Sequence, residues 1–264
     1  MSELSADLTD VSPVHPAGSL SWLILLALAV GGFGIGTGEF VIMGLMPTIA
    51  ADLAVTEPQV GHVISSYALG VVVGAPILAI FGARLYRRHL LLLLMVFFAL
   101  GNLASALAPD YHSLLLARFV AGLPHGAYFG VAALVAASLV APNKRAAAIS
   151  LVMLGLTLAI LVGNPLATLL GQQIDWRYAF VAVAVIALLT VLLIALFLPL
   201  DRSVVRSNPL AELQAFRRIQ VWYALGIGAI GFAGMFCVFS YLAVTLLEVT
   251  GVAPLVVPLA VASF

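Results

Sequence analysis

Two charged side chains stand out because they lie within stretches that are otherwise almost wholly apolar. Glu39 lies near the end of the apolar run 22–49, and Arg118 lies near the beginning of the run 113–141. An ionised side chain inside a membrane costs at least about 2.5 kcal/mol unless it is paired or faces water. Such residues commonly bind protons or a polar substrate, so Glu39 and Arg118 are the first candidates for a functional site.

His125 extends this candidate site along one helix face. Gly122 and His125 follow Arg118 by four and seven residues, a spacing that aligns the three positions on a helix. Phe129 continues the line by one turn. Each residue also has a structural interpretation: Glu39 as a neutral hydrogen-bonded group, Arg118 as a structural pair or an interfacial cation, and His125 as a packing residue. The functional interpretation makes Glu39 a proton or substrate site, with Arg118 as its candidate partner.

Small residues recur at helical spacing in several of the apolar runs. In the run 146–171 they occupy every fourth position: Gly155, Ala159, Gly163, Ala167 and Gly171. Shorter series are Ser66, Gly70 and Gly74, and the glycines of the stretch 31–38. In lipid, small residues let helix backbones approach closely, so each series predicts a tight helix contact. Glycines in the stretch 31–38 also fit a helix that flexes. Pro165 removes one helical hydrogen bond and predicts a kink.

The composition indicates a membrane protein. Of the 264 residues, 64% are hydrophobic and 8% are charged, and the mean hydropathy is +1.20. Soluble domains are about half apolar and about a quarter charged. The 11 basic and 11 acidic residues cancel, so the net charge does not favour nucleic acid as a partner. The single cysteine excludes an internal disulfide and the five histidines are scattered, so we expect no metal site, no bound cofactor and no enzymatic activity.

The lengths of the apolar runs predict an all-α integral membrane protein. Crossing about 30 Å of hydrocarbon takes roughly 20 residues of helix, and lipid offers no hydrogen-bond partners to an irregular backbone. Seven runs have a suitable length: 22–49, 59–82, 89–108, 113–141, 146–171, 177–199 and 219–247. An eighth begins near Val252 and reaches Phe264 after about 13 residues, which is too short to cross.

The charged residues between the runs predict the orientation. One set of connections carries nine of the eleven basic residues: Arg84, Arg87, Arg88, Lys144, Arg145, Arg202, Arg206, Arg217 and Arg218. The alternate connections carry acidic residues: Asp52, Glu57, Asp110, Asp175 and Glu248. By the positive-inside rule the basic side is cytoplasmic. We therefore predict a multi-pass protein of the cell (inner) membrane with a cytoplasmic N-terminus.

The connection between the sixth and seventh runs is the longest and is the candidate domain boundary. We predict a cytoplasmic tail over residues 1–20, a six-helix transmembrane bundle over 21–199, a cytoplasmic linker over 200–218 and the beginning of a C-terminal bundle over 219–264. The expected partners are the lipid bilayer, a small-molecule substrate and the missing C-terminal bundle, so we expect a C-terminally truncated chain.

Five stretches carry a family pattern: GEFVIMGLMPTIAADLAV, ARFVAGLPHGAYFGVAALVAA, VGNPLATLLGQ, WRYAF and FSYLAVTLLEVTG. They resemble the major facilitator superfamily, and within it the twelve-span drug:proton antiporters of the arabinose-efflux-permease-like branch. The resemblance extends from about Ser21 to the end of the chain. It implies a six-helix N-terminal bundle, a second bundle represented by the seventh span and part of the eighth, and alternating access by rocking.

The resemblance also assigns roles to individual residues. In the loop between spans two and three, the matches to the family's cytoplasmic gate motif are Arg84, Arg87 and Arg88. The departures from that motif, at two glycines and an aspartate, are Ala79, Ala83 and Tyr86. Arg118 and Gly122 match the fourth-span pattern, whose arginine is linked to proton coupling. The fifth-span antiporter pattern is matched by Gly155, Gly163, Pro165 and Gly171, with departures at Asn164 and Ala167.

The function that the resemblance implies is secondary active efflux of small drug-like or sugar-like solutes, with protons as the coupling ion. Glu39 and Arg118 would face the central cavity, and protonation of Glu39 would weaken its pairing with Arg118. Two alternatives fit the same fold. One is a uniporter, which an imposed pH gradient would not drive, and the other is a non-transporting fragment or assembly partner.

Overall fold

The described part of the protein is helical throughout. The computed structural model describes residues 18–82, 85–200 and 217–263, and no strand occurs within them. Seven helical segments are long and apolar enough to cross a membrane, in agreement with the seven predicted runs. The predicted fold class, an all-α integral membrane protein, is confirmed.

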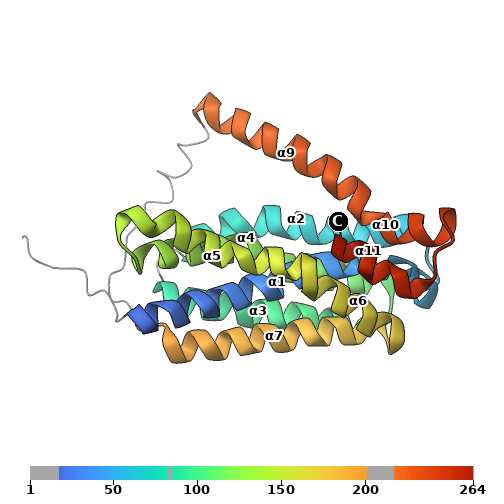
Figure 1. Ribbon diagram of the computed structural model, residues 1–264, viewed down its shortest axis with the longest axis horizontal. Helices are drawn as coiled ribbons and strands as arrows, with labels where there is room; N and C mark the ends of the chain where they lie inside the picture. The colour runs from blue at the N-terminus through green and yellow to red at the C-terminus, as the bar shows by residue number, and fades with distance from the viewer. Residues whose placement is uncertain (1–17, 83–84, 201–216, 264) are drawn as a thin grey trace, which may run out of the picture.

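Six spans form one bundle (Figure 1). Their elements are α1 (Gly18–Asp52), α2 (Glu57–Gly82), α3 (Arg87–Ala106), α4 (Tyr111–Ser138), η1 (Pro142–Lys144), α5 (Arg145–Leu158), η2 (Ala159–Gly163), α6 (Asn164–Gln173) and α7 (Trp176–Phe197). Helix α1 packs against α5, α6 and α7, helix α2 packs against α4, and helix α3 packs against α4 and α7. The central position of α1 places its polar residues inside the bundle.

The two ends of the bundle differ in charge. At one end, where α3 and α5 begin and α7 ends, lie Arg87, Arg88, Lys144 and Arg145, and we name it the basic end. There, Nη2 of Arg88 donates a hydrogen bond to the carbonyl of Ala195 in the last turn of α7 (2.6 Å). The opposite end carries Asp52, Glu57, Asp110 and Asp175. The third gate-loop arginine, Arg84, lies outside the described residues.

Apolar side chains fill the interior in two main clusters, one toward each end. Members of the cluster near the basic end include Ile24, Leu91, Ala136 and Ile194. Members of the cluster near the opposite end include Ile49, Val60, Leu114 and Trp176. Large apolar side chains also cover the outside of the bundle, among them Leu93, Leu100, Leu116 and Leu188. An apolar exterior is what a bundle surrounded by lipid requires.

The fifth span, predicted over 146–171 with a kink at Pro165, is interrupted shortly before that proline. The segment Ala159–Gly163 forms a π-helical turn between α5 and α6. In this turn the N–H of Asn164 binds the carbonyl of Ala159, five residues earlier. Proline has no N–H and cannot continue the regular hydrogen-bond ladder, and Pro165 lies two residues after the end of the turn, with Asn164 between them. The disruption expected at Pro165 is therefore found in the turn that precedes it.

The small residues of the fifth span face α1 at close range. The positions of α1 that oppose Gly155, Gly163 and Gly171 are Ala29, Thr37 and Leu45, respectively. A Cβ added at Gly155 would collide with the carbonyl oxygen of Ala29. The contact is reciprocal, because a Cβ at Gly36 of α1 would lie 2.7 Å from the Cβ of Ala159. The tight helix contact that the spacing predicted is therefore between the fifth span and α1.

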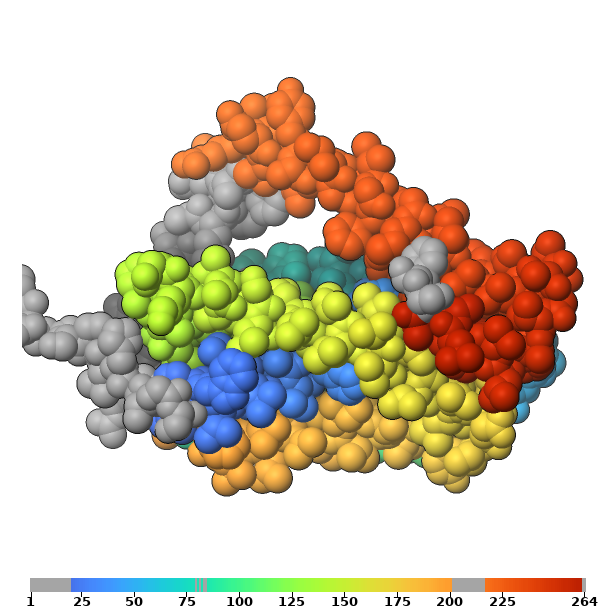
Figure 2. Space-filling view, in the orientation of Figure 1, coloured from blue at the N-terminus to red at the C-terminus, as the bar shows by residue number. Residues whose placement is uncertain are grey.

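The described C-terminal segment begins away from the bundle and packs against it further along (Figure 1). Its elements are α9 (Ile219–Ser240), α10 (Leu242–Val244), η4 (Thr245–Val249), η5 (Pro254–Val256) and α11 (Val257–Ser263). Helix α9 contacts α1 through its last turns, where the rings of Phe236 and Phe239 each lie 5.7 Å from that of Phe40. Figure 2 shows an open space between the first half of α9 and the bundle. Helix α11 packs against η2 and α6.

Candidate functional site

Arg118 is fully buried in the centre of the bundle, with an exposed fraction of 0%. Its Nη2 donates a hydrogen bond to the carbonyl of Gly38 in α1 (2.7 Å), and its Nη1 donates to Oδ1 of Asn102 in α3 (3.3 Å). Its Nε has no hydrogen-bond partner among the described residues. The hydrogen-bonded partners of this cation are therefore neutral oxygen atoms.

Two aromatic rings flank the same guanidinium. Its Cζ lies 4.2 Å from the ring centre of Tyr67 in α2 and 5.3 Å from that of Phe180 in α7. A cation over an aromatic face is attracted by about 2 kcal/mol when both groups are removed from water. Arg118 of α4 thus contacts four other helices, α1, α2, α3 and α7, through one side chain.

Glu39 lies next to this site without bonding to it. Its side chain is partly buried, and its carboxylate forms no hydrogen bond or ion pair with the residues that the structure describes. Gly38, which binds Arg118 through its carbonyl, faces Asn102. Successive side chains of a helix point about 100° apart, so Glu39 points away from that contact. The direct Glu39–Arg118 pair that we predicted is absent, although the two opposite charges still attract each other.

His125 lies on the predicted face of α4 and contacts α2. Its Nδ1 is 3.0 Å from the hydroxyl of Tyr67, and the two rings are 5.9 Å apart in an edge-on arrangement. Phe129, one turn further along, lies 5.3 Å from the imidazole. On the predicted line, Arg118 and His125 therefore both contact Tyr67, and His125 also contacts Phe129.

Sequence reasoning missed two residues of this site, Tyr67 and Asn102. Asn102 is a fully buried amide in the third apolar run, and its Nδ2 donates to the carbonyl of Phe98 (2.9 Å). A polar residue within an apolar span is a signal that could have identified it. Tyr67 offered no comparable signal, since it adjoins the Ser66–Gly70 series that we interpreted only as packing.

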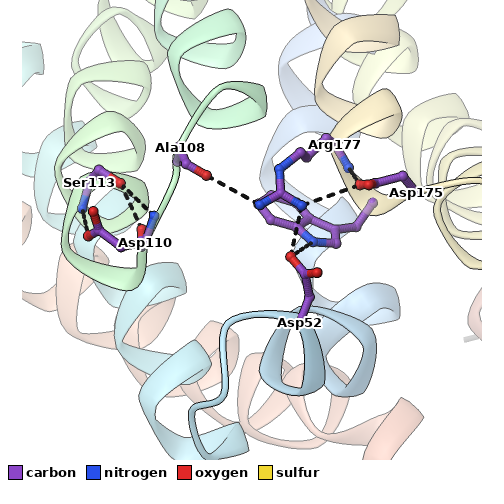
Figure 3. A network of polar contacts seen from close by, with 7 residues as sticks. Asp52, Ala108, Asp110, Ser113, Asp175 and Arg177 are labelled. Carbon is purple, nitrogen blue, oxygen red and sulfur yellow. Dashed lines mark hydrogen bonds and ion pairs between the residues drawn. The ribbon is translucent and has the colours of Figure 1, made fainter.

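A second polar network joins the ends of three spans opposite the basic end (Figure 3). Nη1 of Arg177 lies 2.8 Å from Oδ2 of Asp52, and the same oxygen accepts a hydrogen bond from the indole N–H of Trp176 (3.0 Å). Nη2 of Arg177 donates to the carbonyl of Ala108 (3.4 Å), and Asp175 lies 3.7 Å from Nη1. The network therefore ties α1 and the α3–α4 connection to the start of α7.

The beginning of α4, also drawn in Figure 3, has a capping box. Oδ1 of Asp110 accepts a hydrogen bond from the N–H of Ser113 (3.0 Å), and Oγ of Ser113 accepts one from the N–H of Asp110 (3.2 Å). The hydrogen bond from the Ser113 backbone holds the pKa of the Asp110 carboxyl below its usual value. This cap fixes the start of the helix that carries Arg118 and His125.

The other predicted site residues lie apart from Arg118. Arg87 and Arg88 are at the basic end, and the glycines of the fifth span pack against α1. Asn164 is fully buried, accepts a hydrogen bond from Thr168 (3.4 Å), and has an Nδ2 without a partner among the described residues. Within the same residues, no group of three or more potential metal ligands occurs.

Sequence comparison assigns almost the whole chain to one family. The family model of the Major Facilitator Superfamily matches residues 28–264. The inner membrane transport protein YdhP of Escherichia coli (strain K12) is 42% identical over 233 residues, which are 88% of this chain and 60% of YdhP. The chloramphenicol resistance protein of Streptomyces lividans is 33% identical over 246 residues, which are 92% of this chain and 63% of that protein. The chain thus spans about three-fifths of the length of these curated relatives.

Solved structures show the same fold. A bacterial homologue of the human lysosomal transporter Spinster, in an inward-facing and unoccupied conformation, superposes with a TM-score of 0.75 at 20% identity, covering 94% of this chain and 59% of that one. A D-xylose–proton symporter superposes with a TM-score of 0.68 at 18% identity, covering 92% of this chain and 65% of that one. The fold and the sequence agree, and the chain belongs to the Major Facilitator Superfamily.

Proposed function

We propose that this chain provides the N-terminal bundle of a membrane transporter that exports small solutes in exchange for protons. The observation that carries the proposal is the Glu39 carboxylate, which lies beside the buried Arg118 and has no bonded partner among the described residues. An ionisable group in a membrane span is costly and is retained mainly where it serves a proton or substrate pathway. Glu39 is therefore the proposed proton-binding residue.

Arg118 is proposed to transmit the change in charge. Protonation of Glu39 removes the negative charge that attracts the guanidinium. Because that guanidinium contacts α1 and α3 by hydrogen bonds and α2 and α7 by ring contacts, a change in its position alters four helix contacts at once. Alternating access in such transporters is a rocking of one bundle against the other around a central site.

The names of related proteins support the proposed solute class and coupling ion. The relative from Streptomyces lividans is named for chloramphenicol resistance, which suits export of a drug-like molecule. A structural neighbour is described as a D-xylose–proton symporter, which suits a proton-coupled site in this fold. The small residues and Pro165 of the fifth span match the antiporter pattern. We therefore propose drug-like or sugar-like substrates.

The proposed location is the inner membrane, with the basic end and the N-terminus in the cytoplasm. YdhP is named an inner membrane transport protein. The basic end concentrates Arg87, Arg88, Lys144 and Arg145, and loops rich in Lys and Arg are retained on the cytoplasmic side.

The test is transport in proteoliposomes with an imposed pH gradient. Because the chain spans about three-fifths of YdhP, it is joined to the C-terminal part of YdhP to provide a second bundle. We expect the gradient to drive accumulation of a drug or sugar from a test panel. Glu39→Gln should abolish this accumulation because its amide cannot exchange a proton, whereas Glu57→Gln, at the start of α2, should retain it.

Two results would reject the proposal. Accumulation that remains pH-driven in Glu39→Gln would remove the role of this carboxylate. Downhill flux that an imposed gradient cannot turn into accumulation, in the protein with Glu39 intact, would identify a uniporter.

A further inference from the structure

Tyr67 bridges the two basic groups of the candidate site. Its hydroxyl lies 3.0 Å from Nδ1 of His125, and its ring centre lies 4.2 Å from Cζ of Arg118. Tyr67 belongs to α2, whereas Arg118 and His125 both belong to α4. Its side chain is 2% exposed, so water does not compete for either contact. One side chain of a neighbouring helix therefore contacts both.

The crossing of α2 and α4 fixes the position of Tyr67. A Cβ at Gly122 of α4 would collide with the carbonyl oxygen of Tyr67, and a Cβ at Gly70 of α2 would collide with the carbonyl oxygen of Phe119. The hydroxyl of Ser66 also donates a hydrogen bond to a main-chain carbonyl of α4 (2.8 Å). Glycine at these positions allows the two backbones to touch. The backbone of Tyr67 is consequently held against the helix that carries its two partners.

The chemistry of the contact determines which atom carries the proton. A cation above the ring of Tyr67 withdraws electron density from the phenol and makes its hydroxyl a better donor. A hydrogen bond donated by the Tyr67 hydroxyl requires a lone pair at Nδ1 of His125. The proton of the neutral imidazole must then be on Nε2. The remaining charged group of this region, Glu39 of α1, forms no bond to Tyr67 or His125.

We infer that Tyr67 is a positioning residue of the site: its ring holds the Arg118 guanidinium, and its hydroxyl holds neutral His125 in the Nε2–H tautomer. This inference deepens the proposed function, because Arg118 and His125 belong to the proposed coupling site. A single tautomer presents the Nε2–H side of His125 as a donor, and the Tyr67 bond occupies the other nitrogen. Tyr67 would thereby determine which ring nitrogen of His125 is available to a proton or a solute.

The test observes the imidazole directly and does not depend on transport. The chain is labelled with 15N-histidine, placed in lipid nanodiscs and studied by NMR above the titration of the ring, with the His125 signals assigned by His125→Asn. We expect the Nε2–H tautomer alone in the unaltered chain. Tyr67→Phe keeps the ring but removes the hydroxyl, so the two His125 nitrogen signals should shift toward those of a mixture of tautomers.

Tyr128→Phe is the matched control. Tyr128 is equally buried on α4, and its hydroxyl donates to the carbonyl of Leu28 (2.8 Å), away from the imidazole. Its replacement should leave the His125 signals unchanged. Unaltered signals from the other four histidines would show that each variant is folded.

A separate variant tests the role of the ring. Tyr67→Leu removes the aromatic face as well as the hydroxyl, so the Arg118 side-chain signals should shift in this variant and stay nearly unchanged in Tyr67→Phe. Unchanged His125 nitrogens in a folded Tyr67→Phe protein would overturn the inference, and so would an equal shift in Tyr128→Phe. The proposed transport function has an independent outcome, because it is decided by the Glu39→Gln flux measurement.

Discussion

Two arginines of the bundle illustrate different uses of the same side chain. Arg177 bonds directly to Asp52 at 2.8 Å, and both side chains are partly exposed, at 29% and 44%. Such an exposed pair contributes at most about 1 kcal/mol, so we assign it to tying helix ends together. Arg118 is fully buried and binds neutral oxygens, while the nearest candidate carboxylate, Glu39, stays unbonded. A carboxylate without a bonded cation needs to break no ion pair before it binds a proton.

The capping residue Asp110 predicts a local dependence of stability on pH. Its pKa is lower in the folded protein, so its stabilising effect is present above the usual carboxyl pKa of about 3.9 and is lost as the pH falls through the folded value. Asp110→Ala should lower the melting temperature at pH 7, and this deficit should shrink as the pH approaches 3. Asp110→Asn should retain the cap without the pH dependence, because an amide oxygen also caps helices. A deficit in Asp110→Ala that is constant from pH 7 to pH 3 would contradict this account.

At the scale of helices, the sequence predicted what depends on local pattern. Apolar length predicted seven spans, and the four-residue spacing from Gly155 to Gly171 predicted a tight contact. The identity of the partner helix and the π-helical turn before Pro165 depend on tertiary packing, which spacing does not encode. Glu39 and Arg118 could be identified from the sequence because a charge within an apolar run is a local feature. Tyr67 could not, because it reaches the site from another helix through tertiary packing.

The contact between the fifth span and α1 predicts a large difference between two glycine substitutions. Gly155→Ala places a Cβ against the carbonyl oxygen of Ala29, whereas Gly130→Ala in α4 meets no atom within 4 Å. Overpacking of this kind costs about 1–3 kcal/mol. We therefore expect Gly155→Ala to lower the unfolding midpoint in detergent, and Gly130→Ala to leave it unchanged or raise it. Equal unfolding midpoints for the two variants would contradict this account, because they would show that α1 and the fifth span can move apart to accommodate the added Cβ without loss of stability.

At the scale of the molecule, the described helices are open toward the basic end. Helix α9 begins beside Arg218 and contacts α1 through Phe236 and Phe239 in its last turns. The first half of α9 is separated from the bundle (Figure 2), and nearly all of its side chains are exposed. In the orientation proposed above, this open side faces the cytoplasm.

That orientation can be tested by labelling single cysteines from each side of the membrane. Cys237 is first replaced by serine, because it is exposed and would react. Lys144→Cys lies in an exposed turn at the basic end, and Thr56→Cys lies in an exposed connection at the opposite end. In intact cells, a membrane-impermeant maleimide should label position 56 and spare position 144 until the membrane is opened, because basic loops are retained in the cytoplasm. Labelling of position 144 in intact cells, with position 56 protected, would invert the topology and place the opening beside α9 on the outer face.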